Sequence, residues 1–117
     1  MKRGEVYQAR LDPIEGSEQA RTRPVVVVSV VIVSRDAIND SSPVLIAVPC
    51  AKYVRQRIYP SQIVLQAGEG GLDVDSVAMA EQVRSIDKGR LLQFRGTLPQ
   101  QAMKRLEQAL LIALDLP

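Results

Sequence analysis

Arg23 is the residue of this 117-residue chain whose position best suits it to chemistry. It stands directly before Pro24 and a valine run at 25–28. Repeated valine favours extended backbone, because β-branched side chains are stiff at χ1 and pack well on a pleated sheet. Pro24 is tolerated as the first residue of a strand and pushes Arg23 towards extended geometry. A guanidinium held at the rim of a rigid strand is well suited to gripping a phosphate.

The residues that the chain lacks exclude several other chemistries. It has no histidine, which is the commonest general base and metal ligand. Its single cysteine, Cys50, cannot build a zinc site by itself, and we expect no metal. It has neither a phosphate-binding P-loop nor a dinucleotide fingerprint, so we also expect no nucleotide cofactor.

The polar side chains that the chain does have suit RNA cleavage without a metal. RNA carries its own nucleophile, the 2′-hydroxyl, and an enzyme needs only to align it, neutralise the developing charge and help to move protons. This compatibility does not by itself distinguish an enzyme from a binding module.

Charge and composition say more about the cellular compartment of the protein than about what it binds. The net charge is only +2. Six basic residues stand against two acidic ones at 19–57, while 58–83 holds four acids and no base. The asymmetry is compatible with a basic face for a polyanion, although on charge alone a solvated surface is the better interpretation. The lone cysteine and the lack of a signal peptide or a membrane-length apolar run favour a cytoplasmic setting with no membrane contact.

The hydrophobic pattern predicts a single domain over 1–117, mainly β with a few helices. Strands are expected at 5–11, 25–33, 44–48, 62–66 and 75–83, with Pro49 marking either the end of the third or an edge strand. We expect a short helix at 86–92 capped by Ser85. A C-terminal amphipathic helix should follow, capped by Thr97 with Pro99 in its first turn. The segment 35–43 is polar and its second half is expected to be a loop.

Several short motifs in order resemble the MazF/PemK toxins. They are Arg3-Gly4-Glu5-Val6-Tyr7, Leu11-Asp12-Pro13, Gly16-Ser17-Glu18-Gln19, Arg23-Pro24-Val25-Val26-Val27, Ala47-Val48-Pro49, Asp75-Ser76-Val77, Glu81-Gln82-Val83-Arg84-Ser85-Ile86-Asp87 and Arg90-Leu91. Each alone is weak, but together they cover nearly the whole chain.

The resemblance implies a fold, an activity and partners. The fold would be a small curled sheet or barrel, similar to the gyrase toxin CcdB, with the C-terminal amphipathic helix. The protein would be the homodimeric toxin of a type II toxin–antitoxin pair, bound by a cognate antitoxin peptide. Members are sequence-specific, metal-independent endoribonucleases that cut single-stranded RNA and leave a 2′,3′-cyclic phosphate and a 5′-hydroxyl.

The resemblance also implies roles for particular residues. Arg23 corresponds to the catalytic arginine. The loop that shapes the site beside it corresponds to Ser17, Glu18 and Gln19, and an acid–glutamine pair near the RNA groove corresponds to Glu81 and Gln82. The variable loop that covers the RNA or the antitoxin tail corresponds to Lys52, Tyr53, Arg55 and Arg57.

For some of these residues a structural interpretation stays open. The structural interpretation of Glu18 and Gln19 is that they organise their own loop through hydrogen bonds to the backbone. Glu81, on an expected buried strand, is a candidate partner for an arginine. The basic residues at 52–57 are either solvated or phosphate-positioning, with Tyr53 able to stack on a base. Cys50 fits a small core hydrophobe.

The chain departs from the family pattern at Ala51. Members of the family usually have a threonine at this position, and that threonine assists at the phosphate. A methyl group cannot hydrogen-bond an oxyanion, and losing one such donor typically costs about 10²–10³ in rate. Cys50 should not substitute, because neighbouring strand residues point to opposite faces. Three hypotheses stay open: a weakened or inactive endoribonuclease, a non-catalytic antitoxin- and RNA-binding homologue, or a gyrase poison like CcdB.

Overall fold

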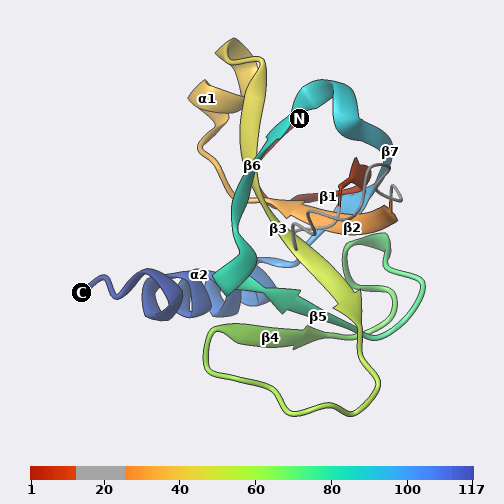
Figure 1. The fold of residues 1–117 in the computed structure, drawn as a ribbon, viewed down its shortest axis with the longest axis vertical. Helices are drawn as coiled ribbons and strands as arrows, with labels where there is room; N and C mark the ends of the chain where they lie inside the picture. The colour runs from red at the N-terminus through yellow and green to blue at the C-terminus, as the bar shows by residue number, and fades with distance from the viewer. Residues whose placement is uncertain (13–25) are drawn as a thin grey trace, which may run out of the picture.

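The computed structural model describes residues 1–12 and 26–117 as one antiparallel sheet with two helices (Figure 1). The strands are β1 (Glu5–Leu11), β2 (Val26–Ile32), β3 (Val44–Lys52), β4 (Gln62–Leu65), β5 (Ser76–Met79), β6 (Arg84–Asp87) and β7 (Leu91–Thr97). The helices are α1 (Asp36–Ser41) and α2 (Gln100–Leu114), with single 3₁₀ turns η1 (Glu69–Gly71), η2 (Ala80–Gln82) and η3 (Lys88–Arg90).

The strand order is β4-β5-β3-β2-β1-β7, and β6 pairs with β3 beside this path. In the described part of the chain the edge strands β4 and β7 do not pair with each other, so the sheet is open. The expectation of a mainly β, curled sheet with a C-terminal amphipathic helix is confirmed, and its barrel alternative is not what the structure has.

β3 is the centre of the sheet because three strands pair with it. β6 pairs with Val44–Ala47, β5 pairs with Cys50–Lys52, and β2 pairs with residues 47–49. The prediction that the strand ends at Pro49 is wrong. Pro49 pairs with Val30 of β2 and lies between the residues that pair with β6 and those that pair with β5, so it interrupts neither of those two pairings. The strand therefore continues to Lys52.

The residues of β3 alternate between two separate cores. Val48 and Cys50 belong to a cluster with Val6, Val31 and the buried face of α2. Leu45 and Ala47 belong to a second cluster on the opposite face, with Ile32 and Ile86. This alternation is the period-2 geometry of a strand, and it decides which side chains of β3 face the helix and which do not.

The short helix expected at 86–92 is wrong. Residues 84–87 form β6, in which Ile86 pairs with Leu45 and is only 2 % exposed, and Ser85 pairs with Ile46 rather than capping a helix. Pairing with the outer half of β3 outweighs the weak local helical pattern, because it buries Ile86 in the second core.

The start of the last helix and the end of the fifth strand also differ from expectation. Thr97 still pairs with Glu5 in β7, so it does not cap α2, whose N-cap is Pro99 without a side-chain hydrogen bond. The strand expected at 75–83 ends at Met79, where the turn η2 begins. This turn lets the chain leave β5 and return along β3 as β6.

Helix α1 lies where the sequence indicated a polar loop. Its anchor is Asn39, which is 2 % exposed, donates to the carbonyl of Ser34 (2.9 Å) and accepts from the Ser34 hydroxyl. That hydroxyl in turn accepts from the backbone N–H of Ile46 in β3 (3.0 Å). A buried, fully bonded polar pair therefore holds a six-residue helix that its own propensity would not sustain.

Candidate functional site

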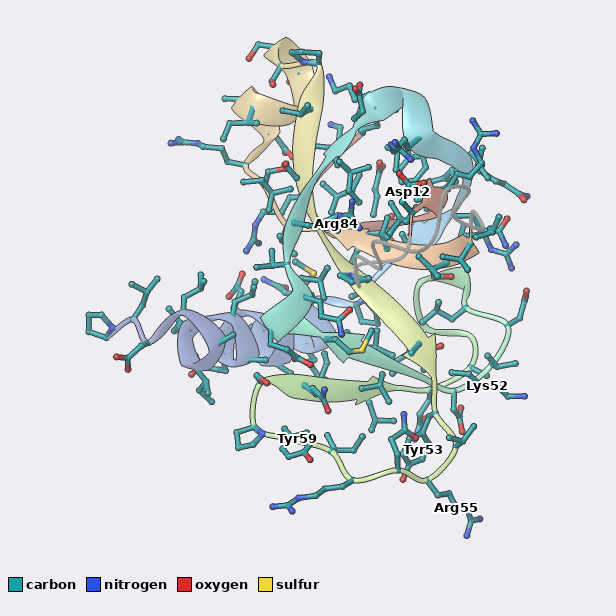
Figure 2. The ribbon with its side chains drawn as sticks, in the orientation of Figure 1. Asp12, Lys52, Tyr53, Arg55, Tyr59 and Arg84 are labelled. Atoms are coloured by element: carbon teal, nitrogen blue, oxygen red, sulfur yellow. The ribbon has the colours of Figure 1, made fainter. Side chains whose placement is uncertain are left out.

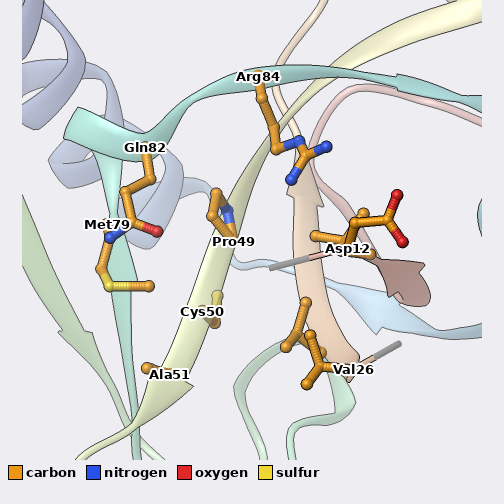
Figure 3. Close-up of a pocket in the computed structure, with 10 residues that line it drawn as sticks. Asp12, Val26, Pro49, Cys50, Ala51, Met79, Gln82 and Arg84 are labelled. Carbon is orange, nitrogen blue, oxygen red and sulfur yellow. The ribbon is translucent and has the colours of Figure 1, made fainter. Parts of the chain in front are cut away.

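The structure has an open pocket of about 580 Å³ where three strand ends and the β5–β6 segment meet (Figure 3). It is lined by Leu11, Asp12, Val26, Val28, Pro49, Cys50, Ala51, Met79, Gln82 and Arg84. Most of this wall is apolar and three residues bring polar groups, which is the usual composition of a ligand site. Its size is also within the usual range for small-molecule and cofactor sites.

Ala51 lines this pocket together with Pro49 and Cys50, the two residues before it in β3. It has the same parity as Leu45 and Ala47, which lie on the face away from α2. The preceding residue, Cys50, belongs to the α2-side core and is 6 % exposed. Burial raises the pKa of the Cys50 thiol to about 12. The thiol therefore stays protonated and hidden, and the expectation that Cys50 is a small core residue is confirmed.

Arg84 is the cation of the pocket. It follows η2 at the start of β6 and pairs with Ala47, so it lies on the same face as Ala51. Figure 3 shows its guanidinium over β2, on the side where Asp12 lies. Among the residues that the structure describes, Arg84 makes no ion pair.

Asp12 is the acid of the pocket, and it stands at the end of β1. Its Oδ2 lies 3.5 Å from Nη2 of Arg90, with both side chains over 40 % exposed, so this pair contributes little to stability. Gln82, the last residue of η2, adds a side-chain amide to the same wall. Among the described residues, the pocket thus offers one cation, one carboxylate and one neutral hydrogen-bonding group around an apolar floor.

The residues expected at the catalytic centre fall in two groups. Ala51 and Gln82 line the pocket. Arg23 and its neighbours Ser17, Glu18 and Gln19 lie outside the described residues, so their roles stay predictions. The pocket is lined by Asp12 and Val26, which are the described residues on either side of that segment.

Glu81 does not occupy the environment that the sequence suggested. It is exposed on η2 rather than buried on a strand, and it does not line the pocket. Its carboxylate accepts hydrogen bonds from Ser61 Oγ (3.1 Å) and Gln62 Nε2 (2.6 Å). The interpretation of Glu81 as a buried partner for an arginine is therefore wrong; it ties η2 to the start of β4.

The expected loop residues lie beyond the pocket. Lys52 ends β3 next to Ala51, and Tyr53, Arg55 and Arg57 follow on the connection to β4. Figure 2 shows Lys52, Tyr53 and Arg55 at the lower end of β3, apart from Arg84 and Asp12. They form a separate basic surface that adjoins the pocket only through Lys52 and Ala51.

Sequence reasoning missed Arg84 and Asp12 as site residues, although both stand in the motifs that carried the resemblance. Gln82 and Arg84 are two residues apart, which places both on one face if the chain there is extended. Ser85 was instead expected to cap a helix, and this error hid the relation. Asp12 becomes a site residue only through the pairing of β1 with β2, which sequence spacing does not give.

Within 1–12 and 26–117, no group of three or more His, Cys, Asp or Glu side chains is arranged to hold a metal ion. No helix of that part of the chain has the length and apolar character to cross a membrane.

Comparison with known proteins places the chain in a family. Residues 2–114 match the model of the PemK-like, MazF-like toxins of type II toxin–antitoxin systems. The chain belongs to the PemK/MazF toxin family. It is 40% identical over 116 residues to the endoribonuclease MazF9 of Mycobacterium tuberculosis, covering 99% of this chain and 98% of that protein. It is 36% identical over 116 residues to the endoribonuclease MazF of Staphylococcus saprophyticus, covering 99% and 92%.

Solved structures of this family share the fold. A mycobacterial endoribonuclease in complex with its cognate antitoxin aligns over 100% of this chain and 97% of its own, with a TM-score of 0.77 and 24% identity. MazF from Deinococcus radiodurans aligns over 99% and 97%, with the same TM-score and 22% identity. The resemblance to PemK/MazF toxins seen in the sequence is thus confirmed over nearly the whole chain.

Proposed function

We propose that this PemK/MazF toxin is an endoribonuclease that binds single-stranded RNA across the pocket and cleaves it slowly. Family membership over residues 2–114 carries the proposal. The pocket supports it, because it holds a guanidinium at Arg84 and is bordered by Asp12 and Val26, between which the chain carries Arg23. We extend the proposal to a homodimer in the cytoplasm that is held in check by an antitoxin peptide.

In the proposed reaction the 2′-oxygen of a ribose attacks the adjacent phosphorus. A bond forms between O2′ and phosphorus while the bond to O5′ breaks, giving a 2′,3′-cyclic phosphate and a 5′-hydroxyl. The 2′-hydroxyl loses a proton and the departing O5′ gains one. No metal is needed, because guanidinium groups neutralise the charge that develops on the phosphoryl oxygens.

The residues divide this work by position. Arg23 takes the scissile phosphate, while Arg84, on the opposite wall from β1, binds a phosphate of the same strand and fixes its path. The apolar surfaces of Val28 and Met79 keep water from part of the site, which strengthens these electrostatic contacts. Ala51, at the floor, offers no hydrogen bond to the oxyanion, and this is why we expect the cleavage to be slow.

Cleavage of a 5′-labelled RNA in the presence of a metal chelator tests the proposal. The expected result is slow formation of a cyclic-phosphate product, with Arg23→Ala reducing the rate about 10²–10³-fold. Arg84→Ala should weaken RNA binding about tenfold through loss of a charge-assisted contact. Arg35→Ala is the matched control, because Arg35 is exposed before α1 and does not line the pocket.

Two results would contradict the proposed endoribonuclease function. Products that vanish when the metal is chelated would mean another nuclease is responsible. Equal effects of Arg35→Ala and Arg84→Ala would remove the pocket from the mechanism.

A non-catalytic binding protein is the second candidate, and Ala51 is the observation that favours it. This second candidate predicts antitoxin binding with weak RNA binding and no cleavage, even when threonine is placed at position 51. A gyrase poison would instead inhibit supercoiling, which a plasmid supercoiling assay measures directly.

A further inference from the structure

The connection between β3 and β4, residues 53–61, is held in shape by its own hydrogen bonds. At its start Val54 N donates to Gln56 Oε1 (2.6 Å), Gln56 Nε2 donates to the carbonyl of Lys52 (3.3 Å), and Tyr53 N donates to the carbonyl of Asp75 (2.8 Å). At its end Tyr59 N donates to Gln62 Oε1 (3.1 Å), and Gln62 N donates to the carbonyl of Tyr59 (2.9 Å). The connection is therefore ordered before any ligand arrives.

This ordered connection exposes groups that a folded chain normally covers. Tyr59 is 51% exposed and Val54 66% exposed. The chain has only three tyrosines, one phenylalanine and no tryptophan, and the ring of Tyr7 is already packed edge-on against Phe94. Of these four aromatic residues, Tyr59 and Phe94 are the most exposed, and Tyr59 is the one that stands among the basic residues of the connection.

Charge defines what this surface would bind. Residues 52–62 contain three cations, Lys52, Arg55 and Arg57, and no acid. The guanidinium of Arg57 lies over the ring of Tyr59, 5.1 Å from its centroid, so cation and ring form one unit. Arg55 has a φ of 64°, a left-handed conformation that arginine rarely adopts. Such outliers concentrate at binding sites.

A basic surface with an exposed aromatic ring matches unpaired RNA. Every base has a face that can stack on a ring, and each nucleotide brings a phosphate for the neighbouring cations. An acidic peptide would use the arginines but would gain little from the open ring. The surface begins at Lys52, the residue directly after the pocket residue Ala51.

We propose that Tyr59, with Arg57 over its ring, is a stacking platform for an unpaired base of RNA flanking the cleaved position. The assignment rests on the proposed RNA-binding function and extends it to a second subsite outside the pocket. It also moves the stacking role from Tyr53, which is half-buried and tied to β5 through Asp75, to Tyr59. Figure 2 shows Tyr59 on the loop below β4, at the edge of the molecule.

The test measures fluorescence anisotropy of 2′-O-methyl oligoribonucleotides, which the enzyme cannot cleave. A randomised decanucleotide spans pocket and loop, while a randomised tetranucleotide fills the pocket alone. Tyr59→Leu keeps an apolar side chain but removes the π face, and should weaken decanucleotide binding about tenfold while leaving the tetranucleotide unchanged. Tyr59→Phe should bind like the parent. Phe94→Leu, which removes a similarly exposed ring on β7 outside the connection, is the matched control and should also bind like it.

Salt dependence gives a second, independent readout. Arg57→Ala should lower the slope of log affinity against log salt by about 0.7, the value for one lost phosphate contact on a single strand. Thermal unfolding of each variant confirms that the fold is retained.

The outcomes separate the two proposals. Parent-like decanucleotide binding by Tyr59→Leu overturns the platform while the pocket function stands. Weaker binding of a heptaglutamate peptide by the same variant, with RNA binding unchanged, also overturns it in favour of a protein ligand. Failure of both oligonucleotides to bind the parent protein overturns the RNA-binding function itself.

Discussion

Replacing Ala51 by threonine should convert a slow toxin into a fast one. The side chain at position 51 faces the pocket, opposite in β3 to the core residue Cys50, and pairs across to Val77 in β5. Threonine adds two heavy atoms at the floor of a pocket of about 580 Å³, so the fold has room for them. Threonine is also a better strand residue than alanine, and we expect no loss of stability.

The size of the effect follows from the one group that is added. A single preorganised hydroxyl directed at the developing oxyanion is worth about 2.7–4 kcal/mol in the transition state, which corresponds to about 10²–10³ in rate. We therefore expect kcat/KM for a labelled RNA to rise by that factor in Ala51→Thr. KM should change little, because the contact is made mainly in the transition state.

Two control variants test whether the added hydroxyl causes the gain in rate. Ala51→Val has nearly the shape of the threonine variant without its hydroxyl, and should cleave no faster than the parent. Cys50→Ser places a hydroxyl one residue away on the α2 side, where it should give no gain in rate and cost about 1–3 kcal/mol of stability as a buried polar group. A valine variant as fast as the threonine variant would refute the hydrogen-bond reasoning. A folded, RNA-binding threonine variant with no gain would favour the non-catalytic protein.

Three further predictions concern the scaffold, all measurable by urea unfolding. Gly71→Ala should destabilise by about 2 kcal/mol or more, because a Cβ there would lie 2.1 Å from the carbonyl oxygen of Arg95 at a φ of 74°. Gly89→Ala, which meets open space, should be nearly neutral. Leu106→Ala, at a fully buried position of α2, should cost about 2–5 kcal/mol. Burial raises the pKa of the Cys50 thiol from 9.0 to about 12, so between these pH values the unfolded chain loses a proton that the folded one keeps. Stability should therefore fall by up to about 1.4 kcal/mol per pH unit there. Cys50→Ala should lack that component, and equal slopes for the two proteins would argue against a buried thiol.

The strands of the sheet centre could be predicted because their patterns are strong. The valine run gave β2, whose described residues end at Ile32, close to the expected limit. The helical spacing of Ala102, Leu106 and Ala109 gave α2, and all three are buried. In these segments local propensity and tertiary burial favour the same state, so the pattern alone suffices.

The elements that were missed depend on partners distant in sequence. Ile86 enters a strand because Leu45 pairs with it, and α1 forms because Asn39 reaches Ser34. The candidate site follows the same rule. Ala51 was found from its place in a motif, whereas Arg84 needed the pairing of β6 with β3 to be placed on the same pocket wall. Sequence spacing alone does not show that two residues so far apart in the chain line the same pocket.

The shared use of β3 by two cores makes this strand intolerant of any change in length. Deleting or inserting one residue between Val44 and Pro49 would shift the parity of everything after it. The thiol of Cys50 would then turn towards solvent, and Ala51 would turn into the packing beneath α2. Such a lesion should abolish folding and activity together. The connection at 53–61 lies outside both cores, so a change in its length would leave the alternation along β3 intact.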